Sequence, residues 1–173
     1  LYLASGWIQG VPQPINALEQ PNVLLRNDGD GTFTNVSSGS GSEDMGIGRG
    51  VAYLDFNNDG CLDLFVGNFG QRARLLQNVC DSSNNWLIVR PVGTTTNRDG
   101  IGTRILVSTE GITRMREVSS GSSFMSQNML AAHFGLGSAK SVDTVTIRWT
   151  TGKVQTITNV AVNRVLTVTE PEN

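Results

Sequence analysis

The stretch "DFNNDGCLD" begins at residue 55 and places short oxygen-bearing side chains at its first, third, fifth and ninth positions. Calcium is a hard cation that takes about six to eight oxygen ligands, and a tight loop with this alternation can turn such side chains toward one point. Gly60 stands at the sixth position, where the backbone must turn sharply, and the next residue can offer its carbonyl oxygen. The spacing therefore predicts a Ca2+ site whose ligands are Asp55, Asn57, Asp59, Asp63 and the Cys61 carbonyl.

The segments on either side of this loop, "VAYL" and "LFVG", have the composition of β-strands. The loop resembles the first nine positions of an EF-hand loop, but it joins two strands rather than two helices, and its twelfth position is Val66 instead of glutamate. The alternative is a polar hairpin that binds no metal. Five matching positions with the glycine in place favour the calcium site.

A weaker acidic loop, "NDGDG" at residues 27–31, contains Asp28 and Asp30. These two carboxylates could bind a second ion. Asn-Asp-Gly tracts between strands are more often turns with positive φ, however, and the turn is the favoured interpretation.

The sequence gives little support to catalysis. A nucleophilic serine needs a base that is held by an orienting group. The only histidine, His133 in "LAAHFGLG", alternates with Ala131 and Gly135 as a strand residue with a satisfied ring would. One histidine and no Cys/His cluster also argue against a catalytic metal centre. We therefore expect a protein that is not an enzyme.

Short runs rich in Val, Ile, Leu, Thr and Phe, separated by Gly, Asn, Asp and Ser clusters, predict an all-β fold. The first half contains a repeat: "LYLASG" (1–6) is echoed by "LFVGNFG" (64–70), and "NVLLRN" (22–27) by "ARLLQN" (73–78). The first copy lacks an opening strand, and the second lacks the closing strand "GTFTNV" (31–36). A propeller needs about four or more blades, so these copies predict partial β-propeller-like blades.

The sequence pattern changes near residues 79–85. About seven candidate strands follow, as in an antiparallel β-sandwich. We predict a repeat region with the calcium loop over residues 1–80 and a sandwich over residues 85–170. Trp86 and Trp149 are expected in the sandwich core, whereas Trp7 in "GWIQG" is a candidate exposed ring for binding. The predicted strands are Trp86–Pro91, Thr103–Ser108, Thr113–Val118, Met129–Phe134, Asp143–Trp149, Val154–Thr158 and Arg164–Thr169.

The two cysteines, Cys61 and Cys80, lack the spacing of a redox or zinc motif. In a secreted protein such a pair is often a disulfide, and a bridge that closes a loop of about 20 residues would stabilise the fold by on the order of 3 kcal/mol. The alternative is two unrelated buried thiols.

Composition excludes some partners. A net charge of −2 gives no reason to expect nucleic acid, and no apolar run approaches the roughly 18 residues needed to cross a bilayer. Residues 1–5, "LYLAS", lack the basic and apolar regions of a signal peptide, and the chain does not start with Met. We therefore expect a mature or processed piece.

Several spaced motifs resemble known families. "GRGVAYLDFNNDGCLDLFVGN" and "NVLLRNDGDGTFTNV" resemble FG-GAP/VCBS repeats, whose blades carry a DxNxDGxxD calcium loop. From Trp86 onward, "NRDGIGTRILV", "REVSSGSSFMSQN", "HFGLGSAKSVDTVTIRWTTGKVQTITNV" and "VLTVTEP" resemble the ASPIC/UnbV domain found after such repeats, as in cartilage acidic proteins. The two resemblances cover nearly the whole chain.

The resemblance implies a secreted or cell-surface protein that binds calcium through its repeats and acts in adhesion or matrix interactions. We therefore expect a non-enzymatic extracellular interaction module with structural Ca2+ and an extracellular protein or glycan as partner. The alternative is a subunit of a homopolymeric filament or surface layer, because unpaired strand edges of incomplete blades can pair with another copy.

Overall fold

The computed structural model describes residues 1–6, 20–80 and 83–172, and these residues contain strands and no helix. The all-β prediction is confirmed. Among the described residues no helix has the length and apolar character to cross a membrane. The strands are β1 (Tyr2–Leu3), β2 (Val23–Asn27), β3 (Phe33–Asn35), β4 (Gly48–Leu54), β5 (Asp63–Asn68), β6 (Arg74–Leu76), β7 (Asn85–Val92), β8 (Arg104–Thr109), β9 (Ile112–Glu117), β10 (Ala132–Gly137), β11 (Ser141–Arg148), β12 (Val154–Ala161) and β13 (Arg164–Thr169).

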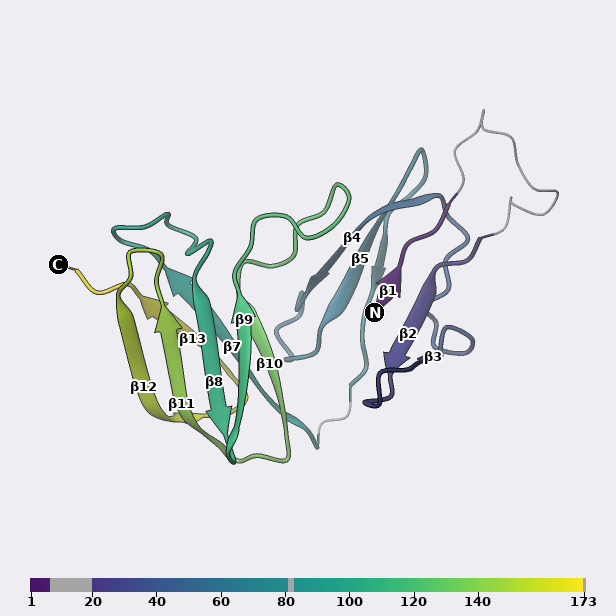
Figure 1. The fold of residues 1–173 in the computed structure, drawn as a ribbon. Helices are drawn as coiled ribbons and strands as arrows, with labels where there is room; N and C mark the ends of the chain where they lie inside the picture. The colour runs from purple at the N-terminus through teal and green to yellow at the C-terminus, as the bar shows by residue number, and fades with distance from the viewer. Residues whose placement is uncertain (7–19, 81–82, 173) are drawn as a thin grey trace. The chain divides into compact units, whose positions relative to one another are not determined.

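Two three-stranded sheets, β1-β2-β3 and β4-β5-β6, form the first part of the chain (Figure 1). All of their strand pairs are antiparallel. Among the residues that the structure describes, the first sheet has no strand that corresponds to β4, and the second has none that corresponds to β3. This is the arrangement of two incomplete blades that the sequence repeat predicts.

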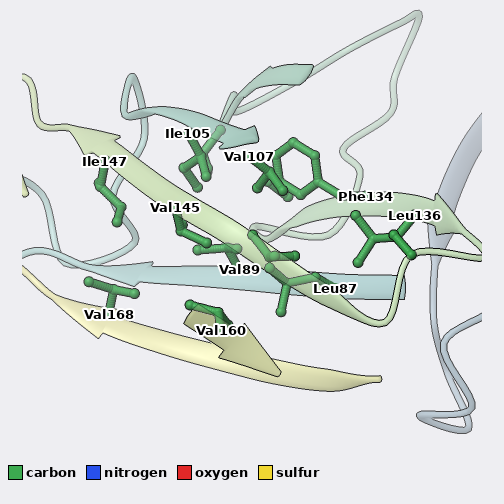
Figure 2. Packing of buried hydrophobic residues seen from close by; sticks show 14 of the residues in the cluster. Leu87, Val89, Ile105, Val107, Phe134, Leu136, Val145, Ile147, Val160 and Val168 are labelled. Carbon is green, nitrogen blue, oxygen red and sulfur yellow. The ribbon is translucent and has the colours of Figure 1, made fainter. Parts of the chain in front are cut away.

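The second part of the chain is a sandwich of two sheets, β10-β7-β13 and β12-β11-β8-β9. Alternating apolar residues on both sheets point into one core, to which β7 contributes Leu87 and Val89 and β10 contributes Phe134 (Figure 2). These three side chains are fully buried, and Trp149 also lies in the core. Burial of apolar area, at about 25 cal/mol per Å², holds the two sheets together.

The predicted strands of the sandwich are all present; their ends are shifted by up to three residues, and one strand pairing differs from the prediction. β10 begins at Ala132, three residues after the predicted start at Met129. β13 pairs with β7 in a parallel register, so the sandwich is not purely antiparallel. Parallel strands need a long connection rather than a hairpin. Here strands β8 to β12 form that connection. A local sequence pattern does not indicate whether two distant strands pair in parallel or antiparallel orientation.

The chain divides into two compact units, each of which includes a short segment from elsewhere in the sequence. The first unit contains Leu1–Phe56, Leu62–Asn78 and Gly121–Gln127, and the second contains Asn57–Cys61, Val79–Ser120 and Asn128–Asn173. The tip of the predicted calcium loop therefore belongs with the sandwich.

Candidate metal loop and its supports

The predicted calcium loop connects β4 to β5, and the antiparallel register of these strands ends with the pair Leu54 and Asp63. Two left-handed residues reverse the chain: Asn58 has φ of 59° and Gly60 has φ of 88°. Asparagine and glycine are the residues that tolerate this backbone region best. The local sequence therefore encodes the turn directly.

The exposed side chains of the loop bond to one another and to the backbone. The Asn57 amide Nδ2 donates to Asp59 Oδ2 at 2.7 Å, and the Cys61 N–H donates to Asp59 Oδ1 at 2.8 Å. The Asp59 N–H also donates to Asn57 Oδ1 at 3.3 Å. Such Asx contacts shape a tight polar turn.

Asp63 is fully buried, in contrast to Asn57 and Asp59. Its Oδ2 accepts the Phe56 N–H at 3.1 Å, and its Oδ1 accepts the Asn78 N–H at 2.8 Å. Each carboxylate oxygen has two lone pairs, so these bonds do not use up its capacity. Asp63 thus fixes the base of the loop through the backbone.

Three residues of the second unit hold the loop tip. Cys61 forms a disulfide with Cys80. His133 Nε2 lies 2.8 Å from the Gly60 carbonyl oxygen, and a Cβ at position 60 would collide with the indole of Trp86. The expectation that His133 is a strand residue with a satisfied ring is confirmed. Glycine is required at position 60 by both its φ and this close approach.

Within the described ranges no three His, Cys, Asp or Glu side chains gather closely enough to hold a metal ion. That group of residue types does not include the Asn57 amide or a main-chain carbonyl, both of which are usual calcium donors. The loop therefore offers hard oxygen donors on a correctly turned backbone, without a preassembled carboxylate cluster.

The second acidic loop has the contacts of a turn. Asp28 Oδ2 accepts the Thr34 hydroxyl at 2.7 Å, and this bond is the main reason that the pKa of Asp28 is lowered. Asp30 Oδ1 accepts the Thr32 hydroxyl at 2.6 Å, and that bond likewise lowers the pKa of Asp30. Both carboxylates thus serve the β2–β3 hairpin.

Sequence reasoning did not connect Trp86 or His133 with the loop. Trp86 was expected in the core, but it is half-buried and contacts Gly60 on the outer face of its sheet. The alternation along β7 and β10 was the available signal, because Leu87 and Phe134 point inward and their neighbours must point outward. Trp7, the candidate exposed ring, lies outside the described residues.

Repeated strand motifs in small sheets, followed by a two-sheet sandwich, define an all-β protein with a repeat part and a sandwich part. Comparison with known families identifies both. Residues 15–66 match the FG-GAP-like repeat, and residues 93–173 match the family described as ASPIC and UnbV. An FG-GAP-like repeat and an ASPIC/UnbV domain are thus found in this order along the chain by similarity, as the sequence motifs indicated.

The relatives include three proteins named Cartilage acidic protein 1. The one from Mus musculus is 28% identical over 160 residues, which cover 87% of this chain and 24% of that protein. Those from Xenopus tropicalis and Homo sapiens are 48% and 46% identical over 56 residues, which cover 32% of this chain and 9% and 8% of the two proteins. The chain thus spans at most about a quarter of the length of these relatives.

Proposed function

We propose that this protein is a calcium-binding extracellular interaction module that is not an enzyme, and that its calcium is structural. The observation that carries the proposal is the loop at residues 55–63 between β4 and β5, where oxygen donors at alternate positions are combined with left-handed Asn58 and Gly60. Similarity to the FG-GAP-like repeat supports it.

The loop residues would divide the work of binding. Asp55, Asn57 and Asp59 would offer side-chain oxygens, Cys61 its carbonyl, and Asp63 the remaining capacity of its buried carboxylate. Binding would draw the carboxylates of the loop toward one cation, because each negative charge is attracted to it. The ion would thereby hold the β4–β5 hairpin closed.

An extracellular location is supported by two observations. The Cys61–Cys80 disulfide is typical of oxidising compartments. The relatives carry the name Cartilage acidic protein 1, which refers to a tissue rich in matrix. An extracellular protein or glycan, bound in adhesion, is the partner that fits this setting. The net charge of −2 gives no support to nucleic acid as a partner, and no helix among the described residues is long and apolar enough to insert into a membrane.

The test is a comparison of wild type with Asp59→Ala in thermal unfolding, with calcium and with chelator. Calcium at 100 times its Kd should stabilise the wild type by about 2.7 kcal/mol, and the variant should lose most of this gain. Asp99→Ala, a change at an exposed aspartate of the second unit, is the matched control and should keep the full gain. If the melting temperature of the wild type is the same with calcium and with chelator, the proposal is wrong.

A filament or surface-layer subunit is the second candidate function, and exposed edges in the first unit favour it. β3 and β6 are terminal strands of their sheets, and Phe33 and Leu75 on them are 49% and 48% exposed. A hollow of about 610 Å³ in the same unit is lined largely by apolar side chains, among them Leu1, Leu24 and Leu64. Such edges and apolar surfaces are templates for pairing with a second copy.

A further inference from the structure

The aromatic rings of His133 and Trp86 lie on the outer face of the β10-β7-β13 sheet. His133 pairs with Ile88, and Gly135 pairs with Trp86, in the antiparallel register of β10 and β7. Ile88 is only 3% exposed although its strand neighbours Leu87 and Val89 point to the opposite face, into the core. The outer face of this sheet is therefore covered, and the Gly60 contacts of both rings show that the loop tip lies against it.

The peptide group between Gly60 and Cys61 is held at both ends. A carbonyl oxygen can only accept, so His133 Nε2 must carry a proton and donate to the Gly60 oxygen at 2.8 Å. The N–H of the same peptide donates to Asp59 Oδ1 at 2.8 Å. Rotation of this peptide plane would break both bonds, and the disulfide to Cys80 restrains the residue that follows.

We propose that His133 is a positioning residue for calcium binding: its Nε2–H fixes the Gly60–Cys61 peptide, and with Trp86 it presets the turn from which the Cys61 carbonyl meets the ion. The inference rests on the proposed calcium function. Preorganisation raises affinity because backbone freedom that is lost before binding is not lost again on binding. His133 acts through the loop and does not touch the ion.

The test is calorimetric titration with CaCl2 of the full chain and of three variants. His133→Leu removes the donor and keeps an apolar side chain of useful size, so the calcium Kd should rise about tenfold, the equivalent of about 1.4 kcal/mol. His133→Gln restores an N–H donor and should return the Kd to within about threefold of wild type. Lys140→Ala, at an exposed residue in the turn after β10, should leave it unchanged.

The outcomes separate the two proposals. A wild type that binds no calcium overturns the proposed function and this inference with it. A wild type and a His133→Leu variant with equal Kd values overturn only the inference, even if the variant unfolds more easily in chelator. Failure of His133→Gln to restore affinity also overturns it.

A measurement on the wild type covers the case in which His133→Leu does not fold. Nitrogen-15 spectra of the imidazole should show the proton on Nε2, with exchange that slows when calcium is added. A ring whose Nε2 carries no proton, or whose proton exchanges at one rate with and without calcium, would overturn the inference.

Discussion

At the scale of single residues, Glu170 shows how a buried charge is held. The residue is 1% exposed, and its Oε2 accepts the N–H groups of Thr94, Thr95 and Thr96 at 2.9–3.1 Å. Its Oε1 accepts the Thr151 hydroxyl at 2.7 Å. Burial alone would raise the pKa of Glu170, but these hydrogen bonds outweigh it and lower the pKa to about 2. The carboxylate thus joins the end of the chain to the loop after β7.

Glu170 should make stability depend on pH. Because its folded pKa of about 2 lies below the ordinary 4.5, its contribution is complete above about pH 4.5 and is lost as the pH falls toward 2. Glu170→Gln should therefore lower the melting temperature by several degrees at pH 7, and the gap from wild type should narrow below pH 4.5. Glu172→Gln, at the exposed glutamate nearby, is the control. A gap that stays constant from pH 7 to pH 3 would contradict this role.

At the scale of elements, β4 is a terminal strand whose outer edge is occupied. Gly48 N–H donates to the Ser5 carbonyl at 2.8 Å, and Val51 N–H donates to Ser126 Oγ at 2.9 Å. Ser126 belongs to segment 121–127, which lies in the same compact unit as β4. Covering an edge in this way blocks its pairing with another chain, so β3 and β6 remain the better candidates for contacts between copies.

Removal of the Ser126 hydroxyl should expose this edge. Ser126→Ala leaves the Val51 N–H without its partner, which should cost about 1 kcal/mol and speed hydrogen exchange at the Val51 amide. Ser126→Thr keeps the hydroxyl and should restore protection, and Ser123→Ala in the same segment should have little effect. Unchanged exchange at Val51 in the alanine variant would show that the segment does not protect the strand.

At the scale of the whole molecule, the two candidate functions predict different oligomeric states in solution. Light scattering and negative-stain microscopy with calcium and with chelator distinguish them. The module predicts a monomer at all concentrations whose melting temperature rises with calcium. The filament predicts polymers that come apart in chelator, because the β4–β5 hairpin would lose its ion. A monomer that persists at high concentration in calcium would count against the filament.

The sequence alone determined the classes of structure along the chain. Each of these features depends on a few neighbouring residues, so it can be recognised in the sequence directly. They are the strand-length apolar runs, the repeated "LYLASG" and "LFVGNFG" motifs, and the turn at Asn58 and Gly60. The predicted donors of the calcium loop depend on spacing, which is also local. For that reason the fold class and both family resemblances were available before the structure.

Only the tertiary structure decided which distant residues meet. His133 lies 73 residues from Gly60, and Ser126 lies 75 residues from Val51. The parallel pairing of β13 with β7 and the Glu170 anchor are also contacts between distant segments. Such contacts follow from how the sheets pack around one apolar core, and many chain directions satisfy the same local alternation of polar and apolar residues. The supports of the loop therefore became visible only in three dimensions.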